Sequence, residues 1–224
     1  DTLAGGQGND NLEGGQGNDI YHWGSGDGND VIREAQKAGL DRLILTDLNV
    51  DNVTFTQSLD QVRDLIITNK ITGEKINLSM SYRVNGAGSN EGVQYLEFAD
   101  HTVWDQDAMR EVAVLQGTDA AESITGDDYY GERIDSGAGN DTIEGLGGAD
   151  TFIFAANFGQ DVINDFDNDD VIEFRAGTFA NYGQVLEAMV DNGTDTSITL
   201  DESNSIVLRN TLVSDLQDAD FRFV

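Results

Sequence analysis

Large apolar residues recur every nine positions in two stretches of this chain, residues 1–43 and 115–174, between clusters of glycine, asparagine and aspartate. An apolar residue with polar neighbours on both sides predicts a very short strand that turns one side chain inward. The glycines ahead of each strand predict tight turns with positive φ. Turn and strand, taken twice, make one coil of a solenoid whose inward residues stack in a narrow core. The pattern therefore predicts two parallel β-solenoid segments.

The repeated unit is G-G-x-G-x-D-x-U-x, in which U is the large apolar residue. In the first stretch the Asp and U positions are Asp1/Leu3, Asp10/Leu12, Asp19/Tyr21, Asp30/Ile32 and, with a weaker match, Asp41/Leu43. In the second they are Glu122/Ile124, Glu132/Ile134, Asp141/Ile143, Asp150/Phe152, Asp161/Ile163 and Asp170/Ile172.

The remaining residues lose this period. Runs rich in β-branched and aromatic residues predict strands at 52–59, 64–69, 75–80 and 93–98, a hairpin turn at 71–75 and one or two helical turns at 105–112. Helical spacing of Val185, Leu186, Met189 and Val190 predicts a helix over 181–193 that stops at Gly193, and a hairpin turns around 201–204.

Together these patterns predict an all-β chain: two parallel solenoid segments, an intervening and mostly antiparallel β segment, and a small α+β C-terminal cap. The expected domains are residues 1–43, 44–114, 115–174 and 175–224.

The net charge of the chain disfavours some classes of binding partner. The chain has 42 acidic and 12 basic residues, a formal net charge of −30, so a nucleic-acid duplex or an anionic membrane surface would repel it. It has no cysteine, which excludes disulfides and thiolate metal sites. No apolar run approaches the roughly 20 residues of a membrane span, and no signal peptide is visible. The sequence starts in mid-repeat without Met, so we expect it to be part of a longer protein.

Loops two units apart are expected to stack on the same edge of the solenoid, with an Asp carboxylate and glycine-turn carbonyls lining each gap. Six to eight hard oxygen ligands suit Ca²⁺, whereas both histidines lie outside the loops, which disfavours Zn²⁺ and Cu. Several Ca²⁺ ions are therefore the expected cofactor. The candidate ligand residues of the first segment are Asp1, Gly5, Gly6, Gly8, Asp10, Gly14, Gly15, Gly17, Asp19, Gly26, Gly28, Asp30 and Asp41. Those of the second are Gly137, Gly139, Asp141, Gly145, Gly147, Gly148, Asp150, Gly159, Asp161, Asp165, Asp167 and Asp170.

Some loops depart from the pattern. Glu122 and Glu132 hold Asp positions, and Ala120 and Tyr130 stand where glycine is usual, so we expect these loops to bind weakly or not at all. Near the last turn, aspartates crowd between residues 165 and 170. They form either an additional ligand cluster or a solvated acidic rim.

The nonapeptides resemble the repeats-in-toxin (RTX) family, whose repeats are known to bind Ca²⁺. This resemblance implies β-rolls with Ca²⁺ between turns and type I secretion from a Gram-negative bacterium. Residues 147–174, "GGADTFIFAANFGQDVINDFDNDDVIEF", are similar to the C-terminal roll of serralysin-type proteases. The middle segment, with "YHWGSGDGNDVI" before it and "VQYLEFADHTVW" at its end, resembles the haemolysin-type calcium-binding-related domain.

Catalytic patterns are weak. A Ser-His-Asp triad has only His22 and His101 to draw on, and there is no H-E-x-x-H, no P-loop and no EF-hand loop. Trp23 and Trp104 belong either to the core or to a sugar-stacking surface. No enzyme activity is expected of this segment itself; a catalytic domain would precede it.

Two classes of function remain. One is a Ca²⁺-dependent folding and export module of a secreted protein, with the type I secretion apparatus as its partner. The other is a polysaccharide-binding or adhesin-type surface module attached to an extracellular enzyme. The end of the chain, Asp218–Val224, has an acidic residue before Phe221, Phe223 and Val224, which resembles the C-termini of type I-secreted proteases and lipases. Alternating with Arg222, the same rings are equally compatible with a final strand.

Overall fold

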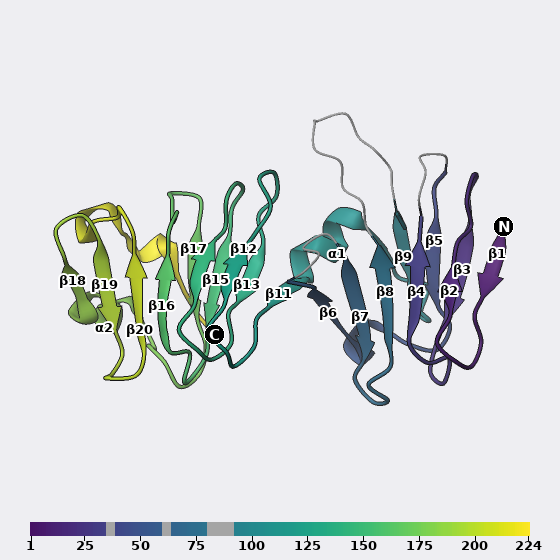
Figure 1. Ribbon diagram of the computed structural model, residues 1–224, viewed down its shortest axis with the longest axis horizontal. Helices are drawn as coiled ribbons and strands as arrows, with labels where there is room; N and C mark the ends of the chain where they lie inside the picture. The colour runs from purple at the N-terminus through teal and green to yellow at the C-terminus, as the bar shows by residue number, and fades with distance from the viewer. Residues whose placement is uncertain (35–38, 60–63, 80–91) are drawn as a thin grey trace. The chain divides into compact units, whose positions relative to one another are not determined.

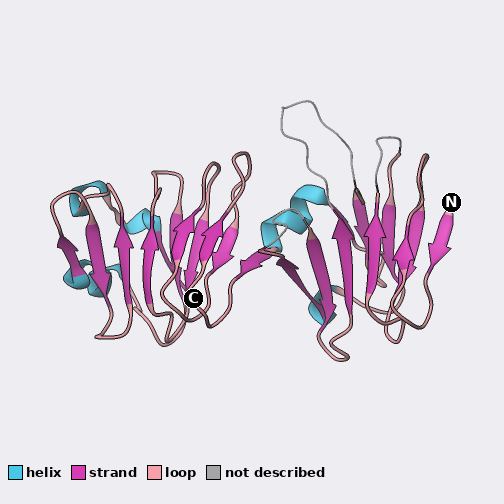
Figure 2. Cartoon of the chain, viewed as in Figure 1, coloured by secondary structure: helices cyan, strands magenta, loops and turns pink. Residues whose placement is uncertain are grey.

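The computed structural model describes residues 1–34, 39–59, 64–79 and 92–224 (Figure 1). Strands dominate it, joined by turns and a few short helices (Figure 2). The chain divides into two compact units, Asp1–Ala113 and Val114–Val224. The last residue of the strand predicted over 75–80, Met80, lies outside the described residues.

Unit 1 begins with the first glycine-rich segment. Its strands are β1 (Thr2–Ala4), β2 (Asn11–Leu12), β3 (Ile20–Trp23), β4 (Asp30–Arg33) and β5 (Arg42–Leu45). They pair in parallel with the next strand but one, β1 with β3, β3 with β5 and β2 with β4. The two ladders are the two walls of a flattened coil. Tyr21, Ile32 and Leu43, all at U positions, are buried between them, which confirms the predicted β-roll.

The intervening segment of unit 1 is built on hairpins. It contains β6 (Val53–Gln57), β7 (Leu65–Asn69), β8 (Lys75–Ser79), β9 (Tyr95–Glu97), β10 (Val103–Asp105), the short 3-10 helix Val50–Asn52 and α1 (Gln106–Val112). β6, β7 and β8 are antiparallel, as are β9 and β10.

These strands do not form a sheet of their own. β8 pairs in parallel with β4, and β9 pairs in parallel with β5, so the intervening residues extend both walls of the roll. The sequence predicted the antiparallel pairs but not this parallel junction. As a result, the turn between β7 and β8 lies over the last glycine loop on its edge.

Unit 2 repeats the plan. Its roll strands are β11 (Val114–Gln116), β12 (Ser123–Thr125), β13 (Arg133–Asp135), β14 (Thr142–Glu144), β15 (Thr151–Phe154), β16 (Gln160–Ile163) and β17 (Val171–Phe174). The cap adds α2 (Tyr182–Ala188), β18 (Met189–Asp191), β19 (Thr196–Thr199), β20 (Ser205–Leu208), the 3-10 helices Val213–Asp215 and Asp218–Asp220, and β21 (Phe221–Phe223).

The cap closes the second roll as the intervening segment closes the first. β20 pairs in parallel with β16 and continues antiparallel into β19 and β18, while β21 pairs in parallel with β17. The helix predicted over 181–193 is wrong in its second half, because α2 ends at Ala188. Met189 instead pairs with Ile198 in the sheet, and sheet pairing overrides the helical spacing of the sequence.

Candidate metal centres

A ladder of aspartates runs up each loop edge of the rolls. In each step, the main-chain N–H at one Asp position donates to carboxylate Oδ1 of the Asp one coil later. The N···O distances are 2.9 Å for Asp10–Asp30, 2.9 Å for Asp19–Asp41, 2.8 Å for Asp141–Asp161 and 2.9 Å for Asp150–Asp170. The amino group of Asp1 contacts Asp19 Oδ1 in the same manner. The expected stacking of loops two units apart is therefore present.

The second carboxylate oxygen of these aspartates has a different environment. Oδ2 is buried and receives no hydrogen bond within the described residues in Asp10, Asp19, Asp30, Asp141 and Asp161. A buried carboxylate oxygen without a donor costs several kcal/mol unless a positive charge lies beside it. Each ladder thus presents fixed, unpaired carboxylate oxygens, which are hard ligands suited to Ca²⁺.

The first glycine of the nonapeptide repeat leaves space for the Asp Oδ2 atom. A Cβ atom built on Gly5 would lie 2.8 Å from Asp10 Oδ2, and one on Gly145 would lie 2.2 Å from Asp150 Oδ2. Real Cβ atoms do not approach a carboxylate that closely. The loops of Asp10 and Asp150 therefore need glycine at this position, whereas Ser25, Ser136 and Ala156 hold it in the loops of Asp30, Asp141 and Asp161.

The second and fourth positions of the nonapeptide repeat form its tight turn. Both have positive φ in the best-matching loops, a conformation that glycine adopts without strain. The glycines concerned are Gly6, Gly8, Gly15, Gly17, Gly26, Gly28, Gly137, Gly139, Gly148 and Gly159. Leu146 and Asn157 hold the second position with φ of 70° and 64°, and Gly147 is next to Leu146 at the third.

Side chains alone do not complete a coordination shell. Among the described residues, no three His, Asp or Glu side chains converge on one point. Ca²⁺ takes six to eight oxygens, so most of them would have to be main-chain carbonyls of the glycine turns and water. The rolls contain both kinds of protein ligand: one carboxylate of fixed orientation from the aspartate ladder, and the main-chain carbonyls of the glycine loop.

Electrostatics supports the same interpretation. Burial raises the pKa of Asp161 to about 7, and the neighbouring charge of Asp141 adds to the effect. Burial also raises the pKa of Asp150 and of Asp170 to about 6. The pKa values of Asp30 and Asp141 are raised for the same first reason. Such groups are costly to ionise until a cation compensates them.

Asparagine at the fifth position of the nonapeptide repeat forms a second ladder of hydrogen bonds, which the sequence analysis did not predict. Asn9 Oδ1 accepts from the N–H of Asn29 at 3.0 Å, and Asn29 Oδ1 accepts from the N–H of Lys75 at 2.9 Å. In unit 2, Asn140 Oδ1 accepts from the N–H of Gln160 at 3.0 Å. The repeated Asn-Asp pair in the sequence was the available signal.

The last loop on one edge of each roll is covered by a hairpin turn. In unit 1, Glu74 in the turn between β7 and β8 accepts a hydrogen bond from the N–H of Gly26 at 2.9 Å, and Asp47, in the segment after β5, accepts from the N–H of Ser25 at 3.0 Å. In unit 2, Asn204 Oδ1 accepts from the N–H of Gly159 at 3.1 Å. These contacts join residues far apart in sequence, so no local pattern could have revealed them.

The loops that depart from the repeat are stabilised from within. Glu122 Oε2 accepts from the N–H of Thr118 at 2.7 Å, and Oε1 accepts from its hydroxyl at 2.6 Å. Glu132 Oε2 accepts from the N–H of Asp127 at 3.0 Å. The glutamates therefore bind their own loops, where the aspartates leave an oxygen unpaired.

The aspartates at the last turn bind main-chain N–H groups. Asp165 accepts from Gly145 at 3.1 Å and from Leu146 at 2.8 Å. Asp167 Oδ1 accepts from Asp169, and Asp170 Oδ2 accepts from Asp167, both at 2.9 Å. These contacts hold the turn in place, and the role of Asp165, Asp167 and Asp170 as Ca²⁺ ligands stays a prediction.

The histidines and tryptophans lie apart from the ladders. His101 is exposed and contacts Glu97 at 3.1 Å. Trp23 is fully buried and donates to the carbonyl of Gly28 at 3.2 Å. Trp104 packs on Phe55 and Phe98, with ring centroids 5.3 and 5.0 Å apart. Trp23 is thus part of the core of unit 1, and the partly buried Trp104 packs against this core.

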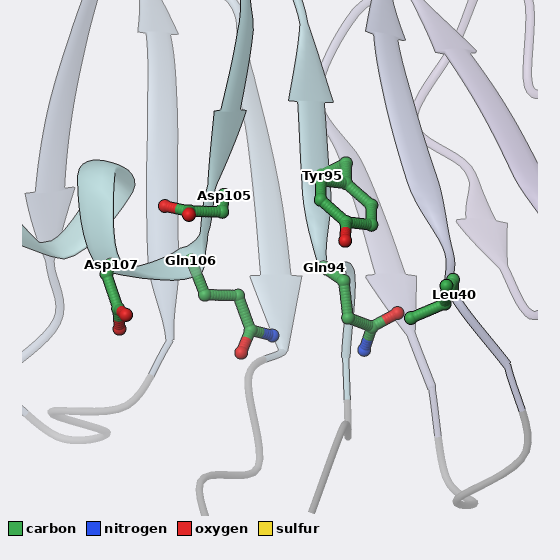
Figure 3. Close-up of a pocket in the computed structure, with 6 residues that line it drawn as sticks. All are labelled: Leu40, Gln94, Tyr95, Asp105, Gln106 and Asp107. Atoms are coloured by element: carbon green, nitrogen blue, oxygen red, sulfur yellow. The ribbon is translucent and has the colours of Figure 1, made fainter. Parts of the chain in front are cut away.

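A small pocket of about 210 Å³ opens beside the end of the first roll (Figure 3). Two of its polar side chains make structural hydrogen bonds: Asp105 caps α1 by accepting from the N–H of Ala108 at 2.9 Å, and Gln94 accepts from the N–H of Asp41 at 2.5 Å. The lining residues are Leu40, Gln94, Tyr95, Asp105, Gln106 and Asp107.

Parallel coils with buried, unpaired carboxylates at their loop edges define the class: a cation-binding β-roll. Comparison with known families agrees. Residues 1–32 and 128–156 match the RTX calcium-binding nonapeptide repeat, and residues 64–108 match the haemolysin-type calcium binding protein related domain. The two glycine-rich segments are therefore RTX repeats, which bind Ca²⁺.

Similar proteins share only parts of their length with this chain. The endo-1,3-1,4-beta-glycanase ExsH of Rhizobium meliloti is 38% identical over 64 residues, 29% of this chain and 14% of the glycanase. The extracellular lipase LipA of Serratia marcescens aligns with the whole chain and 40% of its own, at 16% identity and a TM-score of 0.43. The AlgE6R3 subunit of the Azotobacter vinelandii mannuronan C5-epimerase aligns over 47% of this chain and 79% of its own, at 24% identity and a TM-score of 0.29. Within the described residues, no helix is long and apolar enough to span a membrane.

Proposed function

We propose that this chain is a Ca²⁺-dependent folding and stabilisation module of a secreted bacterial protein. The observation that carries the proposal is the set of buried aspartates with one oxygen bound to the backbone and the other without a donor. In a chain of net charge −30, these carboxylates oppose folding until cations neutralise them.

The energetics favour a switch. A cation that binds only the folded state stabilises it by about 2.7 kcal/mol per site when free ligand exceeds the dissociation constant a hundredfold. Extracellular Ca²⁺ modules have dissociation constants of roughly 0.1–1 mM. With several such sites empty in a low-Ca²⁺ cytosol, the chain stays unfolded there. When Ca²⁺ fills the sites outside the cell, the chain folds.

This behaviour suits export by a type I secretion apparatus, which would pass the unfolded chain to the exterior of a Gram-negative bacterium. The absence of cysteine is compatible with this route. The effector part of the protein lies outside the present sequence in this account, because the RTX repeats are structural modules. Ca²⁺ sites at Asp10, Asp19, Asp30, Asp141 and Asp161 carry the function.

Far-UV circular dichroism tests the proposal. The chain is compared in metal-free buffer, in millimolar Mg²⁺ and in millimolar Ca²⁺ at equal ionic strength. We expect strong β signal in Ca²⁺ alone, because Mg²⁺ demands a rigid octahedral shell that carbonyl-rich loops do not supply. Equal β signal in all three buffers overturns the proposal.

A polysaccharide-binding surface module is the second candidate. It is favoured by the 64-residue similarity to a glycanase, although the matched part is 14% of that enzyme. Retention of the Ca²⁺-loaded chain on alginate and on mixed-linkage β-glucan, against a dextran control, decides it. Retention that disappears with free polysaccharide as competitor supports binding, and elution with the void volume excludes it.

A further inference from the structure

Glu34 and Asp165 occupy equivalent places in the two units. Each follows the Asp of the preceding loop by four residues, where the repeat would have its first glycine. Each lies 20 residues after the first glycine of the coil below and accepts its N–H, Gly14 to Glu34 at 3.1 Å and Gly145 to Asp165 at 3.1 Å. Both are therefore acidic caps on the last coil of one loop edge.

The two caps differ in how their oxygens are used. Asp165 is satisfied by the backbone, since its second oxygen accepts from the N–H of Leu146 at 2.8 Å. Glu34 Oε1 accepts from Gly14 and from the Tyr21 hydroxyl, but Oε2 is buried and receives no hydrogen bond of ordinary geometry within the described residues, although the N–H of Gly15 interacts weakly with the carboxylate. Glu34 is only 4% exposed, so bulk solvent has little access to that oxygen.

A second unpaired oxygen lies beside it. Asp19 is 1% exposed, and its Oδ2 also receives no hydrogen bond within the described residues. A Cβ atom built on Gly14 would lie 2.5 Å from Asp19 Oδ2 and 2.6 Å from the Tyr21 hydroxyl oxygen. Glu34 bonds both to the N–H of Gly14 and to that hydroxyl. The two carboxylates thus meet at one place, around Gly14.

We propose that Glu34 is a cation ligand, which joins Asp19 in a two-carboxylate Ca²⁺ site at the end of the first roll. The inference rests on the proposed Ca²⁺-dependent function and adds a ligand that lies outside the glycine-aspartate pattern. The nearby Asp41 carboxylate, bound through Oδ1 to the N–H of Asp19 at 2.9 Å, adds negative charge to the surroundings of this gap. Because ligand charge raises Ca²⁺ affinity, the site binds Ca²⁺ more tightly than the loops that rely on Asp alone.

Glu34→Gln and Asp165→Asn form a matched pair for the test. Both remove one negative charge from equivalent places and keep an oxygen that accepts the glycine N–H. Isothermal titration calorimetry with Ca²⁺, on the full chain, gives stoichiometry and affinity. Tb³⁺ luminescence excited through tyrosine follows the same sites independently. We expect Glu34→Gln to lose one ion or to weaken the tightest class at least tenfold, whereas Asp165→Asn stays within about twofold of the parent.

Unchanged Ca²⁺ binding by Glu34→Gln overturns the inference. This holds even if the variant is more stable in metal-free buffer, because Glu34 would then be a buried acid and not a ligand. If Glu34→Gln does not fold, Glu34→Asp replaces it: the charge is kept but the carboxylate is withdrawn by one methylene. Lower affinity of that variant supports ligation, and unchanged affinity contradicts it. A parent chain that binds no Ca²⁺ refutes the proposed function itself, which is a different outcome from equal binding by parent and variant.

Discussion

The main-chain N–H of Asp141 donates a 2.8 Å hydrogen bond to Oδ1 of Asp161, and Oδ2 of Asp161 is buried without a donor in the described part of the chain. The hydrogen bond fixes the carboxylate in one orientation. The unpaired oxygen leaves its charge uncompensated. One residue thereby aligns successive coils and, in the proposed function, makes their stacking dependent on a cation.

Loops that keep this arrangement should bind Ca²⁺ better than loops that do not. Asp141→Asn removes the charge from a carboxylate with an unpaired oxygen, so we expect the loss of one bound ion or about a tenfold weaker affinity. Glu122→Gln should change binding less than twofold, because both Glu122 oxygens already accept hydrogen bonds from Thr118. Titration calorimetry on the two variants measures this. Equal losses would refute the ranking of the sites.

Without a cation, the second unit should be more stable in mild acid than at neutral pH. Burial raises the pKa of Asp161 to about 7 and of Asp150 and Asp170 to about 6, above the ordinary value of 3.8. Protons therefore bind the folded state more strongly than the unfolded state, and the stability that they confer is lost as pH rises through 6 to 7. Urea unfolding of metal-free chain at pH 5 and pH 8 checks the sign. Millimolar Ca²⁺ should remove the preference for acid, since cation binding requires the ionised carboxylates.

The asparagine ladder should contribute to stability independently of charge. Asn29→Ala removes the acceptor for the N–H of Lys75 and should cost about 1 kcal/mol in the free energy of unfolding at saturating Ca²⁺. Asn11→Ala, at an exposed strand position, is the control and should cost less than half as much. Denaturant melts of both variants give the comparison. A loss no larger for Asn29→Ala than for Asn11→Ala would mean that the ladder carries no stability.

The C-terminal residues form part of the fold. In β21, the rings of Phe221 and Phe223 stack on Phe174 with centroids 6.3 and 6.1 Å away, and Arg222 contacts Glu173 at 3.4 Å. Deletion of Phe221–Val224 should destabilise unit 2 by about 3–5 kcal/mol, the usual cost of losing a buried aromatic ring such as that of Phe221. Val224→Ala, at an exposed position, should have little effect.

The same deletion separates the structural role of the tail from an export role. Secretion is measured in a strain that has a type I exporter, next to Ca²⁺-induced folding of the purified chain. We expect both to fall, because an exporter would read the tail before Ca²⁺ folds it into β21. Normal secretion with impaired folding would leave the structural role alone.

Periodic features of the fold were readable from the sequence, and long-range ones were not. The nine-residue step predicted buried Ile134, Phe152 and Ile172 and the stacking of loops two units apart, because each coil repeats the same local rule. The parallel pairing of β8 with β4 joins segments more than 40 residues apart, and no local rule encodes it. Glu34 was not predicted as a ligand, because it stands at a glycine position of an imperfect nonapeptide repeat. There the sequence pattern shows only that a glycine is missing.

The most direct test of cation dependence is the stability of Asp161→Asn with and without Ca²⁺. The substitution keeps Oδ1 as acceptor for the N–H of Asp141 and removes the buried charge. A pKa shift from 3.8 to about 7 corresponds to on the order of 4 kcal/mol against folding at neutral pH. We expect the free energy of unfolding at pH 7.5 to rise in metal-free buffer and the stabilisation gained from 5 mM Ca²⁺ to shrink. A variant that is destabilised in metal-free buffer and gains as much from Ca²⁺ as the parent would contradict it.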